Sequence, residues 1–429
     1  MGVDVLLGLQ WGDEGKGKIV DVLCPKYDVI ARFQGGPNAG HTLEFNGLKH
    51  VLHTIPSGIF HENIINMVGN GVVIDPITLK KEIEDLENLN ANPRKNLLIS
   101  NKAQLILPTH KLLDAVTEKA KGDKKIGSTL RGIGPTYKDK IGRTGIRIGD
   151  VFNADFQEKY DVLKEYHLKI AEFHGDKSEI NEREWFDAID FIKELNIVDS
   201  ELLINQYIKE GKKILAEGAQ GSLLDIDFGS YPYVTSSNTI TAGACIGLGI
   251  APSKIGKVYG IFKAYCTRVG SGPFPTELLN DVGEQLRKAG NEFGSTTGRP
   301  RRCGWLDLPA LKYAIMLNDV TELIMTKVDV LNEFENIETC FEYCSEDQRK
   351  DIISFSNGTL SHYKPNFKNV PGWNQNLSNI NSGNDLPGPL EDYIKYIEKE
   401  VEVPVTMLST GPDRTQILKR DNSLTTANA

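Results

Sequence analysis

The sequence lacks the features expected of a membrane or secreted protein. No segment comes near the ~18 to 20 apolar residues that a helix needs to cross a bilayer. The start, Met1-Gly2-Val3-Asp4, has no basic region followed by an apolar core, and Leu6 stands where a myristoylation motif needs Ser or Thr. The six cysteines form no CxxC pair and no zinc spacing with histidine, so we expect free thiols in a reducing cytosol. These absences predict a cytoplasmic protein with no membrane partner.

An excess of positive charge is also lacking. The 49 Lys and Arg residues are outnumbered by 58 Asp and Glu residues, which gives a formal net charge of −9. Because a phosphate backbone favours clustered Lys and Arg, this balance argues against nucleic acid as a partner, although one local basic pocket stays possible. What is present is an ordinary globular composition in a chain of 429 residues, long enough to bury a large core.

Short apolar runs recur along the chain, at residues 3–9, 29–33, 64–68, 97–99, 214–216 and 323–325. Runs of this length, separated by helical stretches, predict an α/β fold with a mostly parallel central sheet flanked by helices. Residues 153–211 are charged and amphipathic, which predicts a helical insertion. Residues 345–386 are rich in Asn, Ser and Gly, which predicts an irregular surface stretch. No repeat divides the chain, so we treat residues 1–429 as a single domain.

A glycine-rich loop, QWGDEGKGK at residues 10–18, follows the first predicted strand. Its glycines allow a tight turn that brings backbone N–H groups close to a phosphate, as in P-loop nucleotide-binding folds. Gly12 to Lys18 fits the spacing G-x4-G-K, but Ile19 stands where a P-loop has Ser or Thr to hold magnesium. Asp13 is the nearest oxygen donor suited to that ion. The alternative is a solvated Gly/Lys turn between strand and helix.

A second small-residue loop, QGGPNAGHT at residues 34–42, follows the second predicted strand. His41 beside these glycines suits an acid that works near neutral pH, although a lone histidine in a turn more often only caps a backbone group. Because both loops follow strands, we expect them to meet at one end of the sheet, where open α/β folds bind ligands.

Together the two loops resemble the adenylosuccinate synthetase family. The resemblance extends, in order, through GSTLRGIGP (127–135), EGAQG (217–221), VTSSN (234–238), TTGRPRR (296–302), TKVD (326–329) and STGPDR (409–414). It spans residue 2 to about residue 420. It implies an enzyme that uses GTP to phosphorylate the 6-oxygen of inosine monophosphate (IMP), after which the amine of L-aspartate displaces phosphate to give adenylosuccinate and GDP in purine (AMP) biosynthesis.

The resemblance assigns chemistry to individual residues. Asp13 matches the base that removes the purine N1 proton, and His41 matches the general acid that stabilises charge as the β–γ bond of GTP breaks. Lys16 supplies a point charge near the phosphates, and Gln220 completes the catalytic set. One Mg²⁺ per subunit is implied, held by Asp13 and by the backbone carbonyl of Gly40. Ile19 is therefore a mark of this family rather than a defect of the loop.

The resemblance also implies how GTP is held. Asp329 accepts the N1–H and N2 amino protons of guanine, which selects against adenine, and Lys327 covers the face of the base. The same Lys-x-Asp spacing occurs by chance at residues 121–123, so the signal rests on placement after a strand. The positions implied for GTP are Gly12, Asp13, Glu14, Gly15, Lys16, Gly17, Lys18, Gly40, His41, Thr42, Arg301, Lys327, Val328, Asp329, Ser409, Thr410 and Gly411.

The remaining positions are implied for IMP and for aspartate. Those for IMP are Asp13, Glu14, Gly15, Lys16, Asn38, Ala39, Gly40, His41, Thr129, Arg143, Gln220, Thr235 and Arg299. Those for aspartate are Ser295, Thr296, Thr297, Gly298, Arg299, Pro300 and Arg301, because planar guanidinium groups suit carboxylates. Arg143 matches an arginine that reaches the IMP phosphate of the neighbouring subunit, which implies a homodimer. As a residue in KIGR it is otherwise a solvated charge.

Two other functions fit parts of the sequence. A GTP-binding regulatory module would use the same guanine loop without ligation, but it has no need of an arginine-rich loop that holds an amino-acid carboxylate. An ATP-using amide or amine ligase is the second, and Asp329 speaks against it. Read alone, the three arginines at 299–302 also suggest a small basic patch, but three charges in a chain of net charge −9 are too few to bind nucleic acid.

Overall fold

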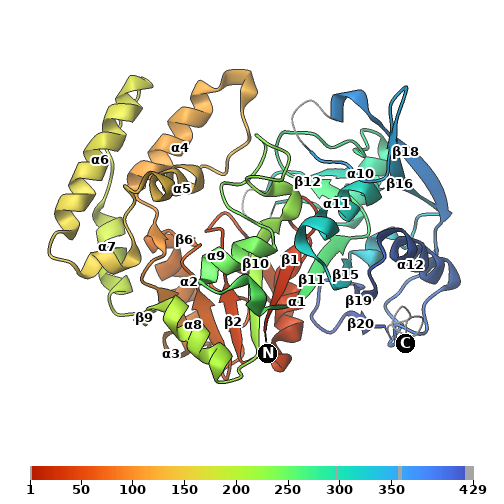
Figure 1. Ribbon diagram of the computed structural model, residues 1–429, viewed down its shortest axis with the longest axis horizontal. Helices are drawn as coiled ribbons and strands as arrows, with labels where there is room; N and C mark the ends of the chain where they lie inside the picture. Colours follow the sequence, from red (N-terminus) through yellow and green to blue (C-terminus); the bar gives the residue numbers. More distant parts are fainter. Residues whose placement is uncertain (1, 295–297, 356–359, 421–429) are drawn as a thin grey trace.

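The fold is built on a ten-stranded sheet that crosses the middle of the molecule (Figure 1). The computed structural model describes residues 2–294, 298–355 and 360–420. The strand order is β20-β19-β15-β11-β1-β10-β2-β5-β7-β9, and every neighbouring pair is parallel except β19 with β20. The strands are β1 (Val3–Gly8), β2 (Val29–Arg32), β5 (Ile65–Val68), β7 (Leu97–Ser100), β9 (Ile197–Val198), β10 (Ile214–Gly221), β11 (Ile255–Lys263), β15 (Glu322–Thr326), β19 (Val405–Ser409) and β20 (Ile417–Lys419).

The central strands are buried on both faces, which explains their continuous apolar runs. In β1 the side chains of Val3, Val5 and Leu7 join the largest core cluster, and Leu6 faces the opposite side with α1. All six apolar runs named from the sequence lie in strands of this sheet. The α/β prediction is confirmed, and β9, β11, β19 and β20 are strands that it did not include.

Helices cover both faces of the sheet. The helices are α1 (Lys16–Leu23), α2 (Pro76–Asn88), α3 (Pro93–Asn96), α4 (Pro108–Ala120), α5 (Ile133–Gly142), α6 (Phe156–Phe173), α7 (Arg183–Ile192), α8 (Ser200–Lys209), α9 (Thr241–Leu248), α10 (Asp281–Ala289), α11 (Leu308–Asn318) and α12 (Gly388–Val401). Residues of α8, α9, α11 and α12 share the core of one face, and α1 packs on the other. No helix among the described residues has the length and apolar character needed to span a membrane.

Four small sheets flank the main one. They pair β3 (His41–Phe45) with β4 (Leu48–Leu52), β6 (Val73–Ile74) with β8 (Gln104–Leu105), and β12 (Cys266–Arg268) with β13 (Arg302–Gly304). The fourth joins β14 (Leu306–Asp307), β16 (Asn336–Cys344), β17 (Arg349–Lys350) and β18 (Lys364–Pro371). The expectation of an irregular stretch at 345–386 therefore needs correction, because β18 forms a long antiparallel pair with β16.

Residues 153–211 contain three helices, α6, α7 and α8, but they are not simply appended to the scaffold. β9 lies within the stretch and forms the edge strand of the main sheet beside β7. Trp185 of α7 is fully buried, and its indole N–H donates to the Ile106 carbonyl at 2.9 Å. Figure 1 shows α4 to α7 gathered on one side of the sheet and the C-terminal elements β16, β18 and α12 on the other.

Candidate active site

Three loops meet at the carboxyl ends of the neighbouring strands β1, β10 and β2. The loop after β1 has left-handed backbone conformations at Gly12 (φ 87°), Asp13 (φ 59°) and Gly15 (φ 88°). Gln220 near the end of β10 also has positive φ (57°), and a Cβ on Gly12 would stand 3.7 Å from its Cα. A Cβ on Gly35, in the loop after β2, would stand 3.2 Å from Gln220 Oε1. The two glycine-rich loops therefore meet, as expected, with Gln220 between them.

Glu14 braces the first loop from within. Its side chain is fully buried, and Oε1 accepts the backbone N–H groups of Gln10 (3.2 Å) and Gly12 (2.9 Å). Its Oε2 accepts from the Lys16 ammonium at 2.5 Å. Since this carboxylate is committed to the loop itself, contact between Glu14 and a nucleotide is left to its backbone.

The loop leads directly into α1, whose first turn carries Lys16, Gly17 and Lys18. A helix N-terminus of this kind favours an anion, because its first N–H groups lack partners within the helix. Gly17 is required by packing, since a Cβ there would stand 2.7 Å from His41 Cβ. Ile19 is fully buried in the cluster that includes Leu6, so position 19 offers no ligand for a metal.

His41 begins β3 and is held in one orientation by a buried carboxylate. Its Nδ1 bonds to Glu217 Oε1, and Glu217 also accepts from Ser57 N (2.8 Å) and Ser57 Oγ (2.7 Å). Burial lowers the pKa of His41, and the Glu217 carboxylate opposes this only in part. Burial alone would raise the pKa of Glu217, but the bond from His41 and the charge of Arg32 hold that pKa below its usual range. A neutral imidazole oriented by a carboxylate suits an acid–base role.

Several buried polar atoms around the loops lack a hydrogen-bond partner among the described residues. They include Asn38 Oδ1, His41 Nε2, Gln220 Oε1 and Asp329 Oδ1, which all belong to residues singled out from the sequence. Leaving a buried polar atom unpaired costs free energy, and native structures pair more than ~90% of them. Such a concentration of unpaired atoms is typical of a polar ligand site.

Arg301, which begins the approach to β13, ties the first loop to a second buried network. Its Nε donates to Asp13 Oδ2 at 2.7 Å and its Nη1 donates to Glu292 Oε2 at 2.6 Å. Glu292 also accepts from Lys263 Nζ (2.9 Å) and Tyr265 Oη (2.5 Å). Burial alone would raise the pKa of Glu292, but Lys263, Lys327 and Arg301 hold it at about 2. Sequence reasoning missed Glu217, Glu292 and Lys263; only Glu217 lies in a quoted motif, EGAQG.

The TKVD segment lies beside the first loop. Thr326, the last residue of β15, donates from Oγ1 to the Glu14 carbonyl at 2.8 Å. Lys327 has φ 60° and its ammonium donates to the Gly290 carbonyl at 2.8 Å. Val328 is fully buried, so its side chain is not open to a ligand. Burial raises the pKa of Asp329, and Lys327 and Lys18 oppose this.

Lys18 points toward the C-terminal loop and not along the phosphate loop. Its ammonium donates to Ser409 Oγ (2.8 Å), the Gly411 carbonyl (2.6 Å) and the Gln416 carbonyl (3.0 Å). Lys18, one of the positions implied for GTP, is thus bonded to the C-terminal loop. Ser409 and Thr410 are buried, and the backbone N–H of Thr410 donates to the Gln416 carbonyl at 3.2 Å.

The other residues named from the sequence are more exposed. Thr129 and Arg143 are exposed, Thr235 is half-buried, and Arg143 has φ 64° at the end of α5. Ala39 is buried and its carbonyl accepts from His53 Nδ1 at 2.7 Å, with Gly40 and Thr42 half-buried on either side of His41. Gly298, Arg299 and Pro300 are exposed. Ser295, Thr296 and Thr297 lie outside the described residues.

A parallel α/β sheet with a glycine-rich loop and an anion-binding helix at its carboxyl edge defines a nucleotide-binding enzyme of the P-loop-like class. The family profile "Adenylosuccinate synthetase" matches residues 5–418. The adenylosuccinate synthetase of Cytophaga hutchinsonii is 60% identical over 432 residues, covering 100% of both chains, and that of Flavobacterium johnsoniae is 58% identical over 98% of this chain and 100% of its own. The chain belongs to the adenylosuccinate synthetase family.

Solved structures agree with this assignment. The fully ligated adenylosuccinate synthetase of Plasmodium falciparum matches with a TM-score of 0.93 and 39% identity, over 98% of this chain and 100% of that one. The succinoaminodeoxyadenylate synthetase of cyanophage S-2L matches with a TM-score of 0.62 at 20% identity, over 97% and 95%, which shows a shared fold only. The protein is thus a GTP-dependent ligase that joins IMP and L-aspartate in purine biosynthesis. The regulatory-module and ATP-ligase alternatives are set aside.

Proposed function

We propose that the described loops carry out this ligation with the roles that the sequence assigned to them. The observation that supports this proposal most directly concerns His41. Its Nε2 is buried without a partner among the described residues, and its ring is held through Nδ1 by Glu217. Because Glu217 accepts, Nδ1 carries the proton of the neutral ring, and Nε2 can take up a second proton. The protonated ring then donates from Nε2 to a phosphate oxygen as negative charge develops on that oxygen. Lys16, beside it at the helix N-terminus, supplies positive charge.

Asp13 is the proposed base for the N1 proton of IMP. Its side chain is one-third exposed at the mouth of the loop, and Arg301 bonds to its Oδ2. We propose that the carboxylate of L-aspartate takes over Arg301 from Asp13, which leaves Asp13 free to remove the proton. The 6-oxygen then attacks the γ-phosphorus, and the aspartate amine later displaces phosphate from carbon 6. Gln220 and Asn38, whose buried amide oxygens lack a partner among the described residues, are left to bond to IMP through their side-chain amides.

A magnesium ion fits this donor set. The Asp13 carboxylate and the Gly40 carbonyl are hard oxygen donors of the kind that Mg²⁺ prefers, and the buried Ile19 excludes the usual hydroxyl ligand. When bound, the ion supplies positive charge to the phosphates. We also propose that the protein acts as a cytoplasmic homodimer in which Arg143 serves the partner's IMP site.

A spectrophotometric assay tests the function. Purified protein with IMP, L-aspartate, GTP and Mg²⁺ should raise ultraviolet absorbance as adenylosuccinate forms, and omission of any one component should abolish the rise. Absence of product, or an equal rate with ATP in place of GTP, would contradict the proposal.

The variant Asp13→Asn tests the proposed base. An amide cannot take the N1 proton, so turnover should fall by about 10²- to 10⁴-fold while the melting temperature and GDP binding change little. Asp123→Asn, in the exposed segment 121–123, is the matched control and should leave the rate unchanged. A near-normal rate for Asp13→Asn would show that another group is the base.

A further inference from the structure

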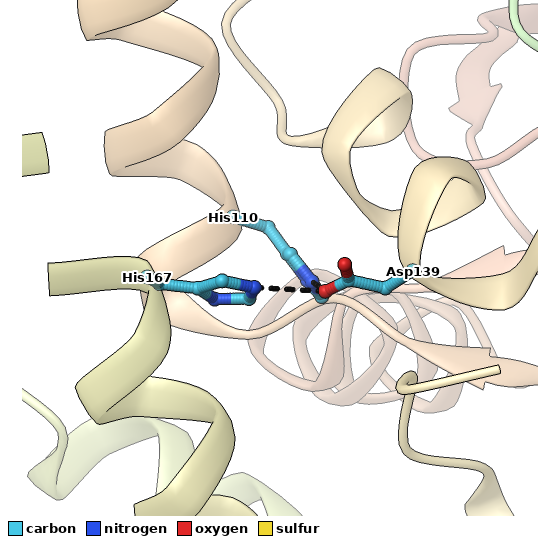
Figure 2. A group of neighbouring side chains, drawn as sticks. All are labelled: His110, Asp139 and His167. Carbon is cyan, nitrogen blue, oxygen red and sulfur yellow. Dashed lines mark hydrogen bonds and ion pairs between the residues drawn. The ribbon is translucent and has the colours of Figure 1, made fainter. Parts of the chain in front are cut away.

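Three buried polar side chains meet where α4, α5 and α6 pack together (Figure 2). The Oδ2 atom of Asp139 accepts from His110 Nε2 and from His167 Nε2, each at 2.8 Å. All three residues are buried, and both histidines are at most 1% exposed. Burial alone would raise the pKa of Asp139, but the two histidine N–H donors hold it well below its usual range.

The hydrogen bonds show that Asp139 holds His110 and His167 together and that the three residues do not form a metal site. We call these three residues the Asp139 clamp. The Leu107 backbone N–H donates to His110 Nδ1 at 2.9 Å, so that nitrogen is unprotonated and Nε2 carries the proton toward Asp139. A histidine that binds a metal through Nε2 needs the opposite arrangement, with Nδ1–H facing an acceptor. His167 Nδ1 bonds to Thr109 Oγ1 at 2.7 Å, and burial lowers the pKa of His110. His110 is therefore a neutral imidazole, and both nitrogens of each ring are hydrogen-bonded.

The same face of α4 continues from His110 to Asp114 and Glu118, at intervals of four residues. Asp114 accepts from the Gly132 N–H (2.9 Å) and from Ser128 Oγ (2.6 Å). Glu118 Oε1 accepts from the N–H groups of Gly127 (2.6 Å) and Ser128 (3.2 Å). Residues one turn apart share a helix face, so these carboxylates form one ridge beneath the loop 127–132, which carries Thr129.

The clamp also fixes the end of α5. The backbone carbonyl of Asp139 accepts from Thr144 N (3.0 Å) and Gly145 N (3.2 Å), which closes the turn around Arg143. On the other side of α5, Tyr137 Oη accepts from the Gly35 N–H at 3.1 Å and donates to the Gly71 carbonyl at 2.7 Å. One helix therefore joins the Asp139 clamp, the turn at Arg143 and the second glycine-rich loop.

We propose that His110, Asp114 and Glu118 of α4, with Asp139 and His167, are positioning residues that hold loop 127–132 and the turn at Arg143 in the geometry that binds the phosphate of IMP. This rests on the proposed roles of Thr129 and Arg143. Neither the loop nor the turn has a core of its own: residues 121–131 are exposed or half-buried, and Leu130 and Arg143 have positive φ. Because the ridge already orders the loop and the turn, these segments lose less conformational entropy when IMP binds.

The test compares two substitutions at Glu118, at the more exposed end of the ridge. Glu118→Ala removes the acceptor for two N–H groups, so the KM for IMP should rise about tenfold, with kcat at saturating IMP and the KM for GTP nearly unchanged. Glu118→Gln keeps an acceptor oxygen and should stay close to the parent. Lys119→Ala, on the exposed neighbouring position, is the control and should change nothing.

The variant Asp139→Asn tests the other end of the ridge, where His110 bonds to Asp139. The uncharged amide oxygen is a weaker acceptor for the two imidazole N–H groups than the carboxylate oxygen that now accepts both, so the KM for IMP should rise again. Equal losses in kcat and in all KM values for Glu118→Ala, or a lowered melting temperature alone, would overturn the proposal. Stoichiometric Zn²⁺ in the parent protein that disappears in Asp139→Asn would overturn the assignment of a clamp.

Calorimetric titration with IMP separates this inference from the proposed function. If the parent binds IMP and makes adenylosuccinate, and Thr129→Ala weakens IMP binding while Glu118→Ala does not, the positioning role alone is wrong. If Thr129→Ala and Arg143→Leu both leave IMP binding unchanged, the proposed roles of those residues are wrong.

Discussion

At the scale of single residues, Arg301 shows how the site balances charge. One side of its guanidinium faces Asp13 and the other faces the buried Glu292, which also neutralises the fully buried ammonium of Lys263. Removing one partner of a buried ion pair leaves the other charge desolvated and unpaired, which is costly. Glu292 therefore supports both the position of Arg301 and the stability of the region.

Glu292→Gln should separate these two effects. Without its charged partner Arg301 is less firmly held, so the KM for L-aspartate should rise about tenfold while the KM for GTP changes much less. Steady-state kinetics with each substrate varied in turn measures this. Glu284→Gln, an exposed glutamate on α10, is the control, and an unaltered KM for aspartate in Glu292→Gln would show that Glu292 does not position Arg301.

The pH dependence of stability tests the same carboxylate. Its pKa is about 2 in the folded protein against an unperturbed value of 4.5, so the folded state binds its proton less tightly than the unfolded state. The stabilisation is present above about pH 4.5 and is lost as pH falls toward 2, amounting to roughly 3 kcal/mol. Urea unfolding between pH 6 and pH 3 should show a smaller loss for Glu292→Gln than for the parent. An equal loss of unfolding free energy in the two proteins would contradict the lowered pKa of Glu292.

At the scale of elements, α1 links the two ends of the nucleotide site. Its first turn adjoins His41, and Lys18, two residues from Lys16, bonds to the loop after β19. The Thr326 hydroxyl bonds to the Glu14 carbonyl and so joins the end of β15 to the same loop. The phosphate loop and the segments proposed to bind guanine are therefore parts of one hydrogen-bonded unit, although they lie on different strands.

Lys18 gives this element a pH dependence. Burial lowers the pKa of its ammonium from 10.5 to about 8, and the neutral amine has one N–H donor fewer for Ser409, Gly411 and Gln416. The KM for GTP should therefore rise as pH increases through about 8, while the KM for IMP stays flat. Lys18→Met should raise the KM for GTP about tenfold to a hundredfold and remove the pH dependence. A KM for GTP that does not change with pH in the parent protein would contradict this role of Lys18.

At the scale of the whole molecule, the fold leaves the choice of nucleotide open. The synthetase of cyanophage S-2L, which shares the fold at 20% identity, binds dATP as its energy donor. We propose that Asp329, whose Oδ1 is buried without a partner among the described residues, selects GTP in this chain. A carboxylate there complements the N1–H and N2 amino group of guanine and opposes the acceptor at N1 of adenine.

Subunit mixing tests whether the proposed site spans two chains. Asp13→Asn and Arg143→Leu should each be nearly inactive as pure dimers. In a random mixture about half of the dimers contain one of each, and one of their two sites then has both residues, so activity should return to roughly a quarter of the parent. No recovery after mixing by reversible dissociation, with exchange verified by a mass-tagged subunit, would place Arg143 in the same site as the Asp13 of its own chain.

Much of the fold was predictable because parallel strands buried on both faces are continuous apolar runs. The strands β1, β2, β5, β7, β10 and β15 were named on that basis. β11 was missed because glycine and lysine interrupt its run, IGKVYGIFK, and β18 because its run, KPNFKNVP, is mostly polar and contains two prolines. The order of motifs, from the glycine-rich start to TKVD, was enough to identify the family.

What the sequence by itself determined is six of the ten strands of the main sheet, the two glycine-rich loops and the chemistry of their side chains, since these depend on local backbone preferences. Only the tertiary structure decided which side chains meet. Lys18 reaches Ser409 across 391 residues, Arg301 reaches Asp13 across 288, and His110, Asp139 and His167 converge from three helices. Such partners are fixed by the packing of the whole core, which cannot be inferred from the spacing of residues that are neighbours in the sequence.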